Sequence, residues 1–148
     1  MSIDNISTML ILSILIATIF FSLSAIHFYW ATGGKRGMDV AVPTKSTGEK
    51  MLSPSVTACI IVAVGLLLMG LLQLRNILSF LNAIDARIFR YGNFVISFIF
   101  LARAIGDFKY AGFFKKVMDT SFAKNDSKFY SPLCLFLSIS TGWLAFHS

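Results

Sequence analysis

Charged residues are scarce in this chain of 148 residues: they make up 14% of it, whereas hydrophobic residues make up 56%. A soluble globular domain usually carries about 25% charged residues. The shortage argues against a water-soluble domain, because too few charges are present to cover its surface. The hydrophobic residues also gather in long runs rather than at the spacing of an amphipathic helix or strand, which favours a membrane over a soluble core.

Cysteines are few, and familiar catalytic motifs are missing. The two cysteines, Cys59 and Cys134, lie inside apolar runs without the spacing of a zinc site or a disulfide framework. The sequence has no Gly-rich phosphate loop, no His-x-x-x-His pair and no Gly-x-Ser-x-Gly. No charged residue falls at the middle of an apolar run, which disfavours proton-coupled pumps and exporters. We therefore expect no metal and no cofactor.

The apolar runs predict transmembrane helices at about 6–30, 56–74, 89–105 and 130–146. A spanning helix needs about 20 predominantly apolar residues, and its backbone must satisfy its own hydrogen bonds in lipid. We do not interpret the first run as a cleaved signal peptide, because no Lys or Arg precedes it and it exceeds the typical core of about 7–15 residues. The sequence thus predicts an all-α bundle of four transmembrane helices that forms a single domain over residues 1–148.

Small residues at helical spacing mark candidate packing faces on two of these helices. Lipid provides no hydrophobic drive for helix association, so close packing depends on small side chains. Ser13 and Ala17 in the first run, and Ser138 and Gly142 in the fourth, have small-x-x-x-small spacing.

Positive charge is distributed unevenly between the two ends of the expected bundle. The formal net charge is +6, and the basic residues lie between apolar runs, which suits anionic lipid headgroups rather than nucleic acid. One side, with the two long connections, holds ten basic residues: Lys35, Arg36, Lys45, Lys50, Arg103, Lys109, Lys115, Lys116, Lys124 and Lys128. The other side holds three: Arg75, Arg87 and Arg90. The positive-inside rule therefore places the long connections in the cytoplasm and both termini outside.

The segment 103–116 combines charged and aromatic residues at the end of the third span. If it is helical, Arg103 and Asp107 share a face, which Tyr110 and Phe114 continue. Such a pair could bind a polar headgroup. The plainer alternative is a salt bridge that holds the end of the span in place.

The following residues favour an amphipathic segment at the membrane interface between the third and fourth spans. A mostly aromatic stripe at helical spacing consists of Tyr110, Phe113, Phe114, Val117 and Ser121. Lys109, Lys115 and Lys116 lie largely off that stripe and are candidates for lipid headgroup contacts. The alternative is an ordinary basic loop.

Polar and aromatic residues converge on the end of the bundle that holds the long connections. The first span ends with His27, Tyr29 and Trp30, and the fourth begins near Tyr130. Tyr and Trp are typical of the aromatic belt at a membrane interface, and His27 could be a simple cap. An ionisable histidine at the end of a span is nevertheless a functional candidate. Together with Arg103, Asp107 and Tyr110, these residues form a candidate polar mouth that faces the cytoplasm.

Several segments resemble a family of small bacterial membrane proteins, the domain of unknown function 3995 family. They are His27-Phe-Tyr-Trp-Ala-Thr-Gly-Gly34, Val42-Pro43, the run from Arg103 to Lys116, Thr120-Ser-Phe-Ala123, Asp126, and Tyr130-Ser-Pro-Leu-Cys134. The resemblance covers nearly the whole chain. It implies a multi-pass protein of a bacterial inner (plasma) membrane, and it implies no reaction. Arg36 stands where the family pattern usually has Trp, so we expect no aromatic anchor at that position.

Three classes of function remain open from the sequence. The first is a module that binds a membrane lipid or another amphiphile at the polar mouth. The second is an intramembrane enzyme on a lipid-like substrate, with His27 and Asp107 as acid and base in one pocket. The third is a transporter, channel or assembly subunit that works as a homo-oligomer, because four spans alone pack too tightly to leave a pore.

Overall fold

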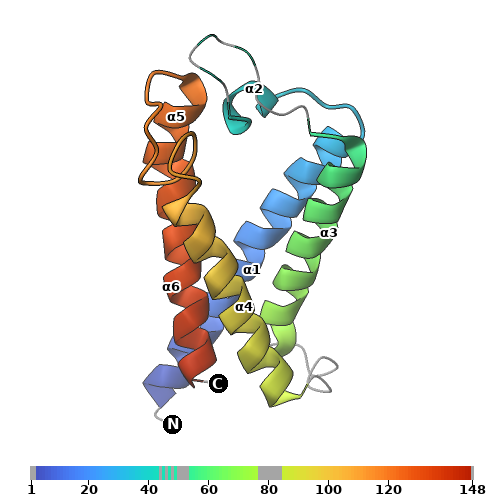
Figure 1. Ribbon diagram of the computed structural model, residues 1–148. Helices are drawn as coiled ribbons and strands as arrows, with labels where there is room; N and C mark the ends of the chain where they lie inside the picture. Colours follow the sequence, from blue (N-terminus) through green and yellow to red (C-terminus); the bar gives the residue numbers. More distant parts are fainter. Residues whose placement is uncertain are drawn as a thin grey trace.

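The computed structural model describes residues 3–43, 45, 47, 49, 54–76 and 85–147, and these residues form helices and no strand. Four helices are long and apolar enough to cross a membrane, which confirms the predicted fold class (Figure 1). They are α1 (Ile3–Ala31), α3 (Val56–Gln73), α4 (Ala86–Ile105) and α6 (Ser131–His147). Residues 77–84, which the sequence assigns to a short connection, lie outside the described residues.

Short elements flank these helices. The four-residue helix α2 (Met38–Ala41) lies in the first long connection, and the 3₁₀ turn η1 (Leu74–Asn76) extends α3. Helix α5 (Ser121–Asn125) and the π-helical turn η3 (Asp126–Tyr130) run directly into α6. The fourth span is therefore longer than predicted, because the helix begins at Ser121 rather than near Tyr130.

Side-chain caps define where three of the helices begin. The side chains of Ser55, Asp85 and Thr120 each accept a hydrogen bond from a backbone amide in the first turn of α3, α4 and α5. Such caps satisfy amides that have no partner inside the helix. At its other end, α4 stops at Gly106, whose φ of 82° is readily adopted only by glycine.

The π-helical turn has a local cause in the sequence. Pro132 has no amide hydrogen, and in a regular helix its ring would collide with the carbonyl group of Lys128. The preceding turn is widened, so that the amide of Ser131 donates to the carbonyl oxygen of Asp126, five residues earlier. Pro132 was expected in the first turn of the fourth span, and it does lie in the first turn of α6.

The long helices pack as two pairs, α1 with α3 and α4 with α6. Within the first pair, Ser24 Oγ donates to the carbonyl oxygen of Ala63 at 2.7 Å. Within the second pair, Ser97 Oγ donates to the carbonyl oxygen of Ser138 at 2.8 Å. Gly142 of α6 also lies against the side chain of Ser97. The predicted small-residue face of the fourth span is thus a packing surface between α4 and α6.

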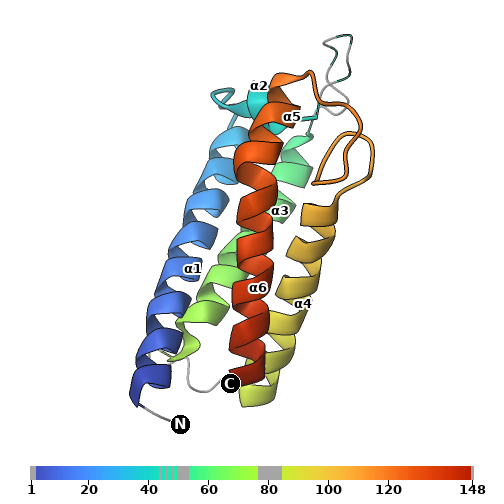
Figure 2. The same cartoon turned by 90° about the vertical axis from the view of Figure 1, so that its left-hand side faces the viewer.

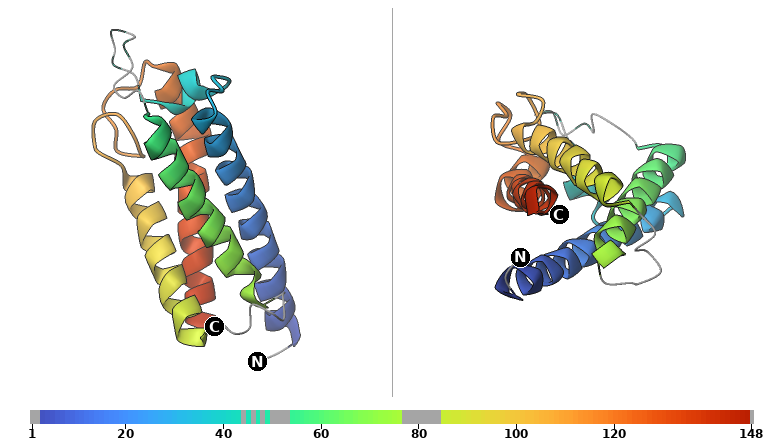
Figure 3. Two further views of the ribbon diagram at one scale, coloured as in Figure 1. Left: turned by 90° about the vertical axis from the view of Figure 1, so that its right-hand side faces the viewer. Right: turned by 90° about the horizontal axis from the view of Figure 1, so that it is seen from below.

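The two pairs contact each other near the termini and diverge toward α2 (Figure 1). In the view turned by 90°, α6 lies in front of α3, with α1 on one side and α4 on the other (Figure 2). Seen from the termini, they form two adjacent layers (Figure 3). A hydrophobic cluster joins them and consists of Met9, Ile16, Phe20, Leu66, Ile96, Leu137 and Leu144. The rings of Phe20 and Phe100 meet across the interface at 5.5 Å between centroids. This packing leaves space between the pairs on the side of α2.

The connection between α4 and α5 corrects one prediction. Residues 106–120 form an irregular loop, so the helix expected through Tyr110 and Ser121 is not present there. Two glycines, Gly106 and Gly112, have positive φ, and the carboxylate of Asp107 accepts hydrogen bonds from backbone amides that a helix would have used. The loop still exposes Phe108, Phe113 and Phe114.

Candidate functional site

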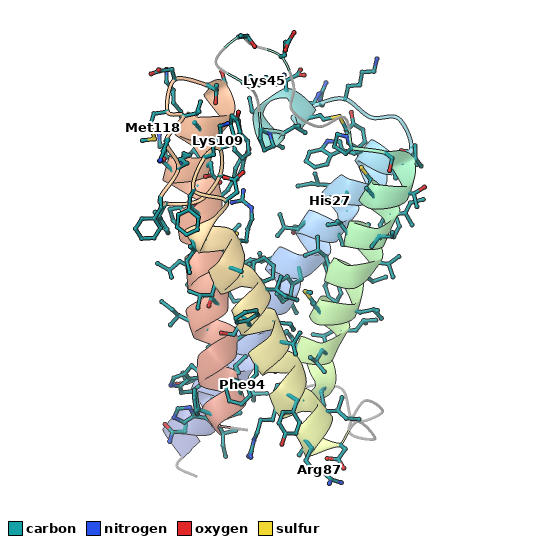
Figure 4. All side chains as sticks on the ribbon, viewed as in Figure 1. His27, Lys45, Arg87, Phe94, Lys109 and Met118 are labelled. Atoms are coloured by element: carbon teal, nitrogen blue, oxygen red, sulfur yellow. The ribbon has the colours of Figure 1, made fainter. Side chains whose placement is uncertain are left out.

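A cavity of about 460 Å³ lies between the two helix pairs, below α2. All four long helices contribute to its wall, which is mostly apolar and includes Leu23, Leu66, Phe100 and Leu137. The polar side chains gather from the ends of three elements: His27 and Trp30 from α1, Arg103 from α4 and Tyr130 from η3. Figure 4 shows His27 on the part of α1 near this end, opposite Arg87 at the end that holds the termini.

Next to the cavity, a buried carboxylate organises the end of the bundle. Asp126 is fully buried and accepts four hydrogen bonds. Its Oδ1 accepts from Arg103 Nη2 at 2.9 Å. Its Oδ2 accepts from the amide of Gly112, from Lys115 Nζ at 3.0 Å and from Ser131 Oγ. A carboxylate offers about four acceptor positions, so Asp126 has little capacity left for a ligand.

The position of Lys115 contradicts the prediction that this lysine contacts lipid headgroups. It was expected to meet lipid headgroups, but its side chain is 1% exposed. Its ammonium donates to Asp126, to Ser127 Oγ at 2.7 Å and to the carbonyl oxygen of Gly112. Lys109 and Lys116 remain exposed, so of the three predicted lysines only these two are placed to reach a headgroup.

Arg103 is bound to Asp126 through only half of its guanidinium. Nη2 forms the ion pair with Asp126, whereas Nη1 is buried and has no hydrogen-bond partner in the described part of the chain. A buried donor without a partner costs about 1–3 kcal/mol. This unsatisfied nitrogen belongs to a residue that lines the cavity.

The expected pair of Arg103 and Asp107 is not formed. Asp107 Oδ1 instead accepts from the amides of Lys109, Tyr110 and Ala111, all within its own loop. Burial alone raises the pKa of Asp107, but these amide hydrogen bonds together outweigh it and hold the pKa below its usual value. Neither Asp107 nor Tyr110 lines the cavity.

His27 faces the cavity region with one ring nitrogen already engaged. Its Nδ1 lies 2.8 Å from the carbonyl oxygen of Leu23, which can only accept, so Nδ1 carries the proton and donates. The other nitrogen, Nε2, is then an acceptor when the ring is neutral. The ring also packs edge-on against Trp30 at 5.0 Å between centroids. His27 is therefore suited to hydrogen bonding at the polar end of the cavity.

Helix α2 covers this end and is attached to both helix pairs. Tyr130 Oη donates to the carbonyl oxygen of Val40 at 3.3 Å, and Trp30 Nε1 donates to the carbonyl oxygen of Arg36 at 3.0 Å. A second hollow, of about 410 Å³, lies beside α2 and is lined by Tyr29 together with His27, Trp30 and Tyr130. Of the seven residues predicted for the polar mouth, the structure gathers His27, Tyr29, Trp30, Arg103 and Tyr130 around α2.

Sequence reasoning missed two contributors to this region. Asp126 entered it only through the family resemblance, although it connects α4, the loop and the start of α6. Cys134 lines the cavity one helical turn after Tyr130, a spacing that could have placed both residues on one face. Among the described residues, no cluster of three His, Cys, Asp or Glu side chains could hold a metal ion.

Comparison with known proteins identifies a family for this chain, and the description of that family names no activity. A family model described as "Protein of unknown function (DUF3995)" matches residues 20–141. The match includes the cavity wall from Leu23 to Leu137 and the whole Asp126 cluster. No curated protein and no solved structure matches the chain.

Proposed function

The chain belongs to the DUF3995 family, and we propose that this multi-pass membrane protein binds an amphiphile in the cavity between its two helix pairs. The observation that carries the proposal is an apolar cavity with a cluster of polar side chains at one end only. Ligand pockets typically have volumes of about 300–1,000 Å³, an apolar wall and a few placed polar groups. A cavity of about 460 Å³ fits that description.

The division of the cavity wall matches the two parts of an amphiphile. Leu66 and Leu137, which line the cavity, belong to the hydrophobic cluster that joins the helix pairs, so a hydrocarbon chain would lie deep in the bundle. His27, Arg103 and Tyr130 would meet the polar group near α2. Lys109 and Lys116, exposed on the loop beside this end, favour its placement at an anionic membrane surface.

We further propose that this end faces the cytoplasm and that both termini lie outside. The positive-inside rule supports the orientation, because ten of the thirteen basic residues belong in sequence to the two long connections and the helix ends beside them, and three belong to the other side.

The structure does not favour an enzyme that uses His27 and Asp107 together. Such a mechanism needs both groups within hydrogen-bond reach of one substrate. His27 lines the cavity, whereas Asp107 does not and is engaged by three backbone amides.

A fluorescence experiment tests amphiphile binding. Trp30 lines the cavity, and Trp143 is the other of the two tryptophans, so Trp143→Phe leaves Trp30 as the sole reporter. The protein would be reconstituted in nanodiscs of zwitterionic phosphatidylcholine and titrated with bromoundecanol that carries its bromine on a carbon near the head group, as do all brominated probes below. Bromine quenches tryptophan only at short range, and Trp30 lies at the polar end of the cavity. We expect saturable quenching of Trp30.

Filling the cavity provides the control. Gly65 lines the cavity, and a Cβ atom there would meet nothing within 4 Å, so Gly65→Phe occupies the space without colliding first with the protein. Leu68→Phe, on the exposed side of the same helix, adds a ring outside the cavity. Saturable quenching should disappear with Gly65→Phe and persist with Leu68→Phe. Equal, unsaturable quenching in all three proteins would overturn the proposal.

A further inference from the structure

The charges beside the cavity do not balance. Lys115 and Asp126 are almost completely inaccessible, and Arg103 forms the second ion pair of the same carboxylate. Two positive groups therefore share one negative group, and of the three side chains only that of Arg103, at 36% exposed, is partly accessible. An excess positive charge at low dielectric is unfavourable unless a further anion is near.

The hydrogen bonds locate this excess on Arg103. The Lys115 ammonium has three acceptors, which is its full capacity. Arg103 donates to Asp126 from Nη2, and its Nη1 is buried without an acceptor among the described residues. None of the described residues that line the cavity is acidic, so this part of the wall supplies no second carboxylate.

The volume of the cavity suits a single hydrocarbon chain. At roughly 30 Å³ for each atom-sized group, a cavity of about 460 Å³ holds on the order of fifteen non-hydrogen atoms. That is enough for one medium-length hydrocarbon chain with a small head, and too little for both chains of a typical membrane phospholipid.

We propose that the occupant is a single-chain amphiphile with an anionic oxygen head, and that this head binds the free side of the Arg103 guanidinium. The inference rests on the proposed function and adds the charge and size of the ligand. Asp126 and Lys115 are positioning groups. Asp126 holds Nη2 of Arg103 in place, and Lys115 shares the negative charge of Asp126. The positive charge of Arg103 is therefore only partly compensated and can attract the ligand. A planar guanidinium binds a carboxylate or a phosphate oxygen well.

A series of probes with the same chain tests this charge preference. In the Trp143→Phe protein in zwitterionic nanodiscs, quenching of Trp30 would be measured with bromoundecanol, bromoundecanoate, bromoundecyl phosphate and bromoundecyl trimethylammonium. Affinities would be corrected for the partitioning of each probe into protein-free nanodiscs. At neutral pH we expect at least one anion to bind about tenfold or more tightly than the alcohol, because a charge-assisted hydrogen bond replaces an unsatisfied donor. The better of the two anions identifies the head as a carboxylate or a phosphate.

The variant Arg103→Lys tests whether anions bind to Nη1 of Arg103 or are attracted to the positive charge of the protein in general. Lysine keeps a positive charge for Asp126 but has no second nitrogen to offer a ligand. The anion preference should fall to less than about threefold, while the affinity for the alcohol changes little. Lys124→Gln, which removes an exposed positive charge from α5, should retain the full preference.

The outcomes separate this inference from the proposed function. Saturable binding of all four probes with equal affinity, or an anion preference that survives Arg103→Lys, would overturn the anionic head and leave the amphiphile site in place. Saturable binding of no probe would overturn both. The probe series on the protein with Arg103 intact decides the question even if Arg103→Lys does not fold.

Discussion

At the scale of single residues, Asp126 holds the end of the bundle together. Its carboxylate joins α4 through Arg103, the loop through Gly112 and Lys115, and the start of α6 through Ser131. Replacing one partner of a buried ion pair leaves the other charge with less compensation, which is usually far more costly than losing an exposed pair.

Two neighbouring lysines test this difference. Lys115→Met should lower the free energy of unfolding by about 1–3 kcal/mol, because Asp126 loses a buried donor but keeps its ion pair with Arg103. Lys116→Met, at the exposed neighbouring position, should change it by less than about 0.5 kcal/mol. Denaturant unfolding in a fixed detergent measures both. Equal effects of the two substitutions would contradict the buried cluster.

Asp107 makes a contribution to stability that depends on pH. Its pKa in the folded protein is lowered, so the contribution is present above the ordinary carboxyl pKa and is lost as the pH falls through the lowered value. Asp107→Asn should therefore be less stable than the unchanged protein at neutral pH, by less than about 1 kcal/mol because the side chain is exposed. The difference should begin to shrink below about pH 3.9, and it should disappear only once the pH has fallen through the lowered pKa of Asp107.

Thermal unfolding of both proteins between pH 3 and pH 7 measures this difference. Asp119→Asn, an equal change of charge on the same loop, is the control. A difference that grows toward acid would show that the amide hydrogen bonds to Asp107 do not favour its charged form.

The sequence identified individual polar residues better than their partners. His27, Trp30, Arg103 and Tyr130 could be placed at one end because each lies at the end of an apolar run. The partner of Arg103 could not be found in this way, since helical spacing favoured Asp107, four residues away, over Asp126. An irregular loop between α4 and α5 decided the pairing, and such a loop has no periodic pattern.

At the scale of elements, the apolar runs were sufficient to predict the number and position of the spans. The fourth helix was predicted too short, because its first two turns, α5 and η3, contain Lys124, Asp126 and Lys128 and are polar in sequence. The Thr120 cap and the proline at position 132 were the available signs of an earlier start and a widened turn. Tertiary hydrogen bonds to Asp126 make the polar turns compatible with burial.

The contact between Gly106 and Gly112 explains how the loop returns to the end of α4. Both have positive φ. A Cβ atom on Gly106 would collide with the backbone of Ala111 and Gly112, and one on Gly112 would collide with the backbone of Ile105 and Gly106. Gly106→Ala and Gly112→Ala should each destabilise the protein by more than about 1 kcal/mol. Gly65→Ala, in open space on α3, should be neutral or slightly stabilising. Thermal unfolding in detergent measures all three, and no loss with Gly106→Ala would contradict the described turn.

At the scale of the whole molecule, both ends of the described chain lie at the same end of the bundle, away from α2 (Figure 1). Cysteine labelling tests the proposed orientation in a protein whose Cys59 and Cys134 are replaced by Ala. An impermeant maleimide on intact cells should label Asn5→Cys and Arg87→Cys, and should label Lys45→Cys and Lys116→Cys only after lysis. Labelling of Lys45→Cys and Lys116→Cys from outside would reverse the orientation, and labelling of just one of them would contradict the topology.

The arrangement of two helix pairs explains why a cavity could not be predicted from the sequence. Four apolar runs predict a bundle, but the angle between the pairs depends on which side chains meet. Phe20 and Phe100 keep the pairs in contact at mid-height, while Gly65 leaves a gap on the side of α2. Neither effect follows from periodicity alone.

The most direct measurement is a crystal structure of the protein grown in a lipidic phase with the brominated anion that binds best, recorded at the bromine absorption edge. Our account predicts one anomalous peak between the two helix pairs, and an oxygen of the head group within hydrogen-bond distance of Arg103 Nη1. A cavity closed by the protein's own side chains, or bromine found only on the outer surface of the helices, would contradict it.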